Sequence, residues 1–405
     1  MKSTTADQPA VDSTRPLRLR EILPGIVAII AVGHTAVDTV ASQMQPLWPE
    51  LKRYFSLDGS GIYWMIILWT SSATFAQVVF GYLSDRIRLD CLIWLAPGVA
   101  AICVGMMGLT DSVLVACLLM AVGGVAIASF HPEAATLCGT AMPGHRSRGI
   151  SIFIAGGFLG QTCGPLYGGL VVRQFGIAGL SCGILWGLVA MFGLMAVLRT
   201  RREIQHRPLP SATVQRRGDP LPWQMLSLIL AIQTLRVIGA TGVPLALAFI
   251  LDARGVDPFR IGVQQSVFLG GIGMGGLICA MVFQQRQERR LLIGLPVVGT
   301  LPFLLLTVTR GWPMTICITM AAITIGMAMP VLISYGQQLV PAAQRLASSM
   351  AMGVSWGIGG CLATIMVSQV NQWPHPEFIF IPFAVTSLGA GLVSLGLPRI
   401  PAAAT

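Results

Sequence analysis

The sequence predicts an all-α membrane protein in which twelve transmembrane helices form two pseudo-symmetric six-helix bundles. The chain is 54% hydrophobic and only 10% charged, whereas soluble domains carry about 25% charged residues. Apolar segments long enough to span a bilayer recur along its whole length. A polar stretch at residues 199–222, rich in Arg and Pro, separates six of these segments from the other six, which indicates two repeated halves.

Each apolar segment is predicted to be a helix, because an open sheet would leave its backbone polar groups without partners in lipid. In the N-terminal bundle, residues 22–198, we expect helices at 22–48, 60–84, 91–109, 112–138, 147–172 and 177–198. In the C-terminal bundle, residues 223–397, we expect helices at 223–251, 261–284, 291–309, 313–338, 346–370 and 376–397. Residues 1–21 and 398–405 are then tails and residues 199–222 a linker, all three cytoplasmic.

The basic residues predict this orientation. Lys and Arg concentrate on the cytoplasmic side of membrane proteins. With both termini placed in the cytoplasm, most basic residues fall on that side, and those left outside are Lys52, Arg53, Arg173, Arg254, Arg260 and Arg310. The net charge of +10 follows from this topology, so we expect no nucleic-acid partner.

One arginine, Arg236, lies within an apolar segment rather than at its end. A charge at the centre of a membrane helix costs about 2.5–3.5 kcal/mol on insertion scales, so it is rarely found without a partner or a watery cavity. Four more ionisable residues lie at similar depth in other segments, and these are His34, Asp38, His131 and Glu133. Opposite charges buried around one cavity predict a site that holds a solute or a proton.

In the first segment, His34, Asp38, Ser42 and Gln45 follow one another at helical spacing and form one polar stripe. Such a stripe must face the protein interior rather than lipid. It is either a structural network between helices or the wall of a cavity in which Asp38 gains and loses a proton. In the second case, competition between a solute and a proton for Asp38 would couple their fluxes.

The fourth segment contains the sequence Phe-His-Pro-Glu at residues 130–133. Pro132 interrupts the helical hydrogen-bond ladder beside the ionisable side chains of His131 and Glu133. This combination inside an apolar helix favours a functional site. The alternative is a wet helix end at the cytoplasmic surface.

Glycines recur every four residues in the fifth segment, at Gly156, Gly160, Gly164 and Gly168. This spacing predicts a smooth groove on one helix face, where another backbone can approach closely. Pro165 adds an expected kink. Generic helix packing would also explain the pattern.

The loop after the second segment reads G-Y-L-S-D-R-I-R, from Gly81 to Arg88. The pattern G-x-L-x-D-R at this place is the signature of the major facilitator superfamily, which the sequence resembles over essentially its whole length. The resemblance implies a transporter fold in which Gly81, Asp85, Arg86 and Arg88 form a conformational latch. The matching loop of the second half, F-Q-Q-R-Q-E-R-R, lacks the glycine and the aspartate, so we expect an asymmetric latch.

A narrower resemblance rests on F-H-P-E in the fourth segment and H-x-x-x-D in the first. Both are similar to the fosmidomycin-resistance-protein group of bacterial exporters, and the fifth-segment G-x-x-x-G-P-x-x-G-G resembles the pattern of antiporters in the superfamily. The resemblance implies a monomer in the bacterial inner membrane that exports a small organic solute, drug-like or anionic, in exchange for protons. Two alternatives stay open: a proton symporter importing an organic anion or metabolite, and a transport-inactive sensor or assembly factor.

Asp38 is the first expected proton carrier and Glu133 the second, with His34 and His131 sharing or relaying the proton. Arg236 is expected to bind an anionic group of the substrate or to balance charge, because its planar fork suits carboxylate, phosphate or phosphonate. Further candidates for substrate binding are Gln45, Gln161, Gln233 and Trp356. The sequence has no nucleotide-binding loop, and we expect no cofactor, no metal site and no enzymatic activity.

Overall fold

The predicted all-helical fold is confirmed. The computed structural model describes residues 25–84, 87, 89–142, 146–200, 223–282, 287–339 and 350–399, which form helices and connecting turns without any strand. Ten of the helical segments in these residues are long and apolar enough to cross a membrane. The helix Cys91–Met107 is shorter, with 17 residues, and the helix Glu288–Leu305 begins with three charged residues.

The helices of the first half are α2 (Gly25–Ser42), α4 (Gly61–Ser84), α5 (Cys91–Met107), α6 (Val113–Thr140), α7 (Arg146–Phe175) and α8 (Cys182–Thr200). The helices of the second half are α10 (Trp223–Asp252), α11 (Pro258–Val282), α12 (Glu288–Leu305), α13 (Trp312–Leu339), α15 (Ser355–Ser368) and α16 (Phe380–Val393). A π-helical turn, Met350–Val354, leads into α15. Most of the expected linker, residues 201–222, lies outside the described residues.

The first transmembrane segment is longer than the sequence indicated. We expected it to end at residue 48, but a 3-10 turn at Gln45–Leu47 follows α2 and the short helix α3 (Trp48–Tyr54) continues from it. Each of these two elements has a proline in its first turn, where a backbone N–H has no helical partner in any case. The chain therefore continues in helical elements past the two prolines. Arg53 lies in the last turn of α3.

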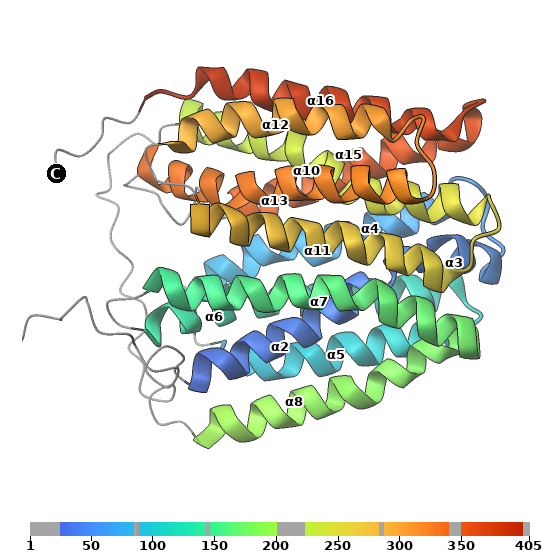
Figure 1. Ribbon diagram of the computed structural model, residues 1–405. Coiled ribbons are helices and arrows are strands. Elements are labelled where there is room, and N and C mark those ends of the chain that lie inside the picture. The colour runs from blue at the N-terminus through green and yellow to red at the C-terminus, as the bar shows by residue number, and fades with distance from the viewer. Residues whose placement is uncertain are drawn as a thin grey trace, which may run out of the picture.

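The two halves lie side by side in Figure 1, with α2, α5, α6, α7 and α8 below and α10, α12, α13, α15 and α16 above. The starts of α2 and α10 and the ends of α8 and α16 lie at the left, and α3 lies at the right, which we call the α3 end. The halves meet along α7 with α11 and along α4 with α15. At both seams small residues allow the approach: Gly262 packs on the Pro165 carbonyl, and Gly357 packs on Phe75.

The glycine groove of α7 packs against α2. Gly156 and Gly160 lie so close to the α2 backbone that a Cβ on either would overlap it, and a Cβ on Gly168 would overlap the backbone of Gln43, directly after α2. The close approach also permits hydrogen bonds between the two helices, because the Thr35 hydroxyl donates to the Gly156 carbonyl at 2.9 Å. Small residues and polar contacts hold helices together in lipid, where burial of apolar surface does not. The α2–α7 pair therefore forms one rigid unit.

A bidentate ion pair joins the two halves at the α3 end. Arg53 on α3 donates two hydrogen bonds to the Asp252 carboxylate at the end of α10, at 2.7 and 2.8 Å. Arg53 is also held by Glu50, one turn earlier on α3. A second contact between the halves, Arg173 to Asp257, is longer at 3.9 Å. The halves are thus held together by charge at this end.

We expect Arg53→Gln to loosen this end of the molecule. The Arg53 side chain is 55% exposed, so solvent screens the pair and its contribution is about 0.5–1 kcal/mol, or roughly a two- to fivefold change in an opening equilibrium. Hydrogen–deuterium exchange should become faster in α3 and in the last turn of α10. Arg260→Gln is the matched control, because Arg260 pairs with Asp257 within its own half. Equal exchange in the two variants would contradict the assigned role.

Candidate functional site

A cavity of about 420 Å³ lies between the two halves. Its walls come from α2, α4, α6 and α7 on one side and from α10, α11, α13 and α15 on the other. It extends from Trp48 and Leu245, near the α3 end, to Gly81 and Gly353, near the opposite end. The size is within the range of small-molecule sites in proteins, about 300–1,000 Å³.

The polar stripe of the first segment faces this cavity. His34, Asp38, Ser42 and Gln45 all line it, although His34, Asp38 and Ser42 are largely buried. Ser42 donates its hydroxyl to the Asp38 carbonyl at 2.7 Å, one turn earlier on the same helix. The stripe is therefore part of the cavity wall.

Two histidines approach the Asp38 carboxylate from different helices. Nε2 of His131, on α6, lies 3.3 Å from Asp38 Oδ1. Nε2 of His34 lies 3.5 Å from Asp38 Oδ2. Gln161, on α7, donates from its side-chain amide to the same Oδ2 at 3.0 Å. His131, from the motif in the fourth segment, thus lines the cavity and does not lie at a wet helix end.

The backbone fixes which nitrogen of each ring carries a proton. Nδ1 of His34 lies 2.7 Å from the Phe153 carbonyl oxygen, and Nδ1 of His131 lies 2.8 Å from the Ile127 carbonyl oxygen. A carbonyl oxygen only accepts hydrogen bonds, so both Nδ1 atoms must be N–H donors. Each Nε2 is then the atom whose protonation changes.

The three side chains form one contiguous cluster, which we call the His34–Asp38–His131 cluster. An ionised carboxylate is acceptor-only. An unprotonated Nε2 is also only an acceptor, so each Nε2–carboxylate contact is favourable when a proton lies between the two atoms. Ligand atoms of the three side chains lie within 4.8 Å of one another, so a small cation other than a proton could fill the same space.

Close packing surrounds the His34 ring of the cluster. The His34 ring stacks on Phe153 at 3.9 Å between centroids and meets the His131 ring edge-on at 5.0 Å. Gly157 lies directly beside the His34 ring, and a Cβ there would overlap the imidazole. The sequence analysis missed Gly157, because it lies between the regularly spaced glycines of the groove and carries no chemical group of its own.

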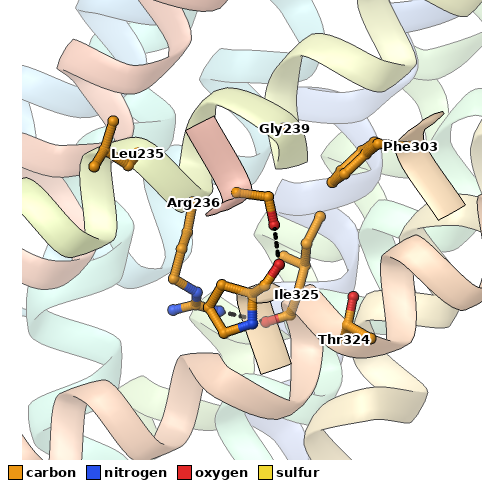
Figure 2. A pocket seen from close by; sticks show the side chains of 8 residues that line it. Leu235, Arg236, Gly239, Phe303, Thr324 and Ile325 are labelled. Carbon is orange, nitrogen blue, oxygen red and sulfur yellow. Dashed lines mark hydrogen bonds between the residues drawn. The ribbon is translucent and has the colours of Figure 1, made fainter. Parts of the chain in front are cut away.

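Arg236 occupies a different place from the one we expected. It is not among the residues that line the large cavity, so the expectation that it faces Asp38 there is wrong for this conformation. Its guanidinium donates to Gln233 Oε1 at 2.7 Å. It also donates to the Ile325 carbonyl at 2.5 Å (Figure 2). The space beside it is a small void of about 10 Å³, the size of one water molecule, lined also by Thr324 and Phe303.

These contacts tie α10 to α13 within the second half. Among the described residues, no carboxylate lies within 4.0 Å of Arg236. The Arg236 guanidinium is therefore buried with two hydrogen bonds to neutral acceptors. The proposed substrate-binding roles of Arg236 and Gln233 stay predictions, since neither side chain reaches the cavity in this structure.

The remaining predicted residues divide between wall and interior. Gln45, Gln161 and Trp356 line the cavity, whereas Glu133 is buried on α6 and does not. Gly81 also lines the cavity. The other members of the expected latch, Asp85, Arg86 and Arg88, lie outside the described residues.

The fold is that of known transporters. Over 93% of this chain and 97% of the other, it is similar to the inward open conformation of the xylose transporter XylE from E. coli, with a TM-score of 0.74 and 10% identity. It is also similar to the nucleoside transporter NupG, with a TM-score of 0.70 and 12% identity over 92% of this chain and all of the other. At these identities, the similarity establishes the fold alone.

Sequence comparison agrees with the structural comparison. The chain is 23% identical over 391 residues to the fosmidomycin resistance protein of Escherichia coli (strain K12), covering 92% of this chain and 93% of that protein. Residues 28–364 match the sequence model of the Major Facilitator Superfamily. Most of the chain lies within that match, and its structural neighbours are transporters rather than enzymes. The chain therefore belongs to the Major Facilitator Superfamily.

Proposed function

We propose that this transporter exports a small organic solute in exchange for protons. Proteins of the family bind small-molecule substrates within the membrane and commonly work as monomers. We place this one in the bacterial inner membrane with both termini in the cytoplasm, because that orientation puts most Lys and Arg residues on the cytoplasmic side.

The observation that supports proton coupling is the tautomer of the two histidines, in which the Nδ1 atoms are fixed as N–H donors. Both Nδ1 atoms donate to backbone carbonyls, and both Nε2 atoms face the Asp38 carboxylate. Each Nε2–oxygen contact is therefore favourable when the two atoms share a proton. These three are the titratable side chains among the described residues that line the cavity, so protonation there changes the charge that a solute meets.

Two observations favour export. The relative that is 23% identical is named for resistance to fosmidomycin, and resistance to a drug by a transporter of this family is most simply explained by efflux. The glycine groove of α7 also follows the pattern that resembles antiporters.

Alternating access supplies the mechanism. In this structure the cavity reaches the end opposite α3, while Arg53 and Asp252 hold the halves together at the α3 end. Rocking of the halves about the cavity exposes it to one side at a time. If solute and protons compete for the cluster, one must leave before the other binds, and the two fluxes run in opposite directions.

The test is transport by the full-length protein in liposomes, with fosmidomycin and ethidium as an anionic and a cationic probe. An antiporter accumulates its substrate when the liposome lumen is acidic, because protons leave as the substrate enters. A symporter accumulates its substrate when the exterior is acidic. Accumulation with an acidic exterior only would overturn the proposed antiport, and no accumulation of either probe in either direction would favour a transport-inactive protein.

A further inference from the structure

Polar side-chain atoms gather around Gly183, near the start of α8. A Cβ built on this glycine would lie 3.6 Å from the Tyr167 hydroxyl, 3.8 Å from Trp186 Nε1 and 3.9 Å from Gln43 Oε1. The three side chains come from α7, from α8 and from the turn directly after α2. None of them lines the large cavity between the halves. The space they surround, which we call the Gly183 site, is therefore distinct from that cavity.

Each of the three atoms is buried, and none has a hydrogen-bond partner among the described residues. The Gln43 residue as a whole is only 1% exposed. Burial of a polar group without a hydrogen bond is unfavourable, and buried Tyr and Trp side chains usually find a partner for their polar atom. Three such groups from separate elements around one point therefore indicate a bound molecule that pairs with all of them.

The chemistry of the three atoms selects the class of ligand. Trp186 Nε1 only donates hydrogen bonds, Gln43 Oε1 only accepts them, and the Tyr167 hydroxyl does both. A cation would meet the N–H of Trp186, and an anion would meet the lone pairs of the Gln43 carbonyl oxygen. A small neutral molecule that donates and accepts can pair with all three atoms. Water is such a molecule, and buried waters in proteins typically make about three hydrogen bonds.

We propose that a buried water molecule occupies the Gly183 site and joins the end of the first segment to α7 and α8. The water accepts hydrogen bonds from Trp186 and Tyr167 and donates one to Gln43. Gln43 lies where α2 ends and the chain turns toward the 3-10 element Gln45–Leu47. The water thus holds this turn against the helices of the first half. Glycine is needed at residue 183, because a methyl group would fill the place of the water.

The sign of a glycine-to-alanine effect tests this proposal. The three distances, all 3.6 Å or longer, are ordinary van der Waals contacts, so Gly183→Ala introduces no steric strain. If the site were empty, the substitution would raise the unfolding temperature, because alanine favours a helix over glycine. If water fills the site, the methyl group expels it and leaves three polar atoms unpaired. We therefore expect thermal unfolding of the full-length protein in detergent, followed by intrinsic fluorescence, to shift down by several degrees.

Two further variants make the result specific. Gly193→Ala, on the same helix, is the matched control, because open space lies where its Cβ would be, and it should be neutral or slightly stabilising. Gly183→Ser places a hydroxyl in the site and should recover part of the stability that Gly183→Ala loses. An unfolding temperature of Gly183→Ala at or above that of Gly193→Ala would overturn the proposal. Equal losses for the alanine and serine variants would also overturn it, because the effect would then be steric.

X-ray radiolysis provides a direct readout of the water. Hydroxyl radicals formed from a buried water oxidise the side chains that touch it, and mass spectrometry locates the oxidised residues. We expect Tyr167 and Trp186 to be oxidised less in Gly183→Ala than in the wild type, while the exposed Trp64 is oxidised equally in both. Equal oxidation of Tyr167 and Trp186 in the two proteins would overturn the assignment of water to the Gly183 site.

Discussion

Replacement of Asp38 by asparagine is expected to abolish accumulation driven by a proton gradient. The asparagine amide has nearly the same size, but it has no negative charge to hold protons between itself and the two imidazoles. Loss of one partner of a buried hydrogen-bonded charge pair weakens binding by about 2–5 kcal/mol, so proton binding at the cluster should weaken roughly 30-fold or more and the coupled flux should fall with it. The measurement is uptake of probe into liposomes with an acidic lumen.

Two further variants make this result specific. Asp111→Asn removes an exposed carboxylate and should transport as the wild type does. Asp38→Glu restores the carboxylate one methylene further from the helix, and it should recover part of the coupled flux. If Asp38→Asn folds, as judged by its elution and thermal stability, and still accumulates probe at the wild-type rate, Asp38 is not the proton site.

The double variant Gly160→Ala/Gly168→Ala is expected to destabilise the protein strongly. At both positions a Cβ would overlap backbone atoms of the first segment, from Thr35 of α2 at Gly160 and from Gln43, directly after α2, at Gly168. A backbone cannot move aside as a flexible side chain can, so each substitution should cost about 1–3 kcal/mol. Thermal unfolding in detergent, followed by intrinsic fluorescence, should show a transition lowered by several degrees.

The chain also contains the matching control. Gly193 on α8 and Gly294 on α12 have open space where a Cβ would lie. The double variant Gly193→Ala/Gly294→Ala should be neutral or slightly stabilising, because alanine favours a helix over glycine by about 1 kcal/mol per site. Equal transition temperatures for the two double variants would mean that the α2–α7 contact does not depend on glycine.

Most of the fold could be predicted from hydropathy, because each membrane helix satisfies its own backbone and needs no distant residue to define it. The boundary near residue 48 was missed for a local reason. Pro46 and Pro49 look like terminators, yet each lies in the first turn of a new helical element and lets the chain continue to Tyr54.

The site was predictable in part. Helical spacing placed His34 and Asp38 on one face, and their chemistry indicated a common site with His131. Depth in the membrane, however, does not say toward which neighbour a side chain points. Arg236 lies at the expected depth but turns toward α13, where the Ile325 carbonyl accepts its hydrogen bond. Rotation of a helix about its own axis is decided by packing between helices, which a single sequence does not encode in any simple pattern.

On α7, the residues that contact α2 and the residues that line the cavity lie on different faces of the helix. Gly156 and Gly160 of α7 meet the backbone of α2, whereas Gly157 and Gln161, one residue further on, face the cavity. Substitutions at Gln161 or Gln45 can therefore change what is recognised without disturbing the contact between the helices. Such a division lets residues of the cavity wall vary while the backbone contact between the two helices is kept.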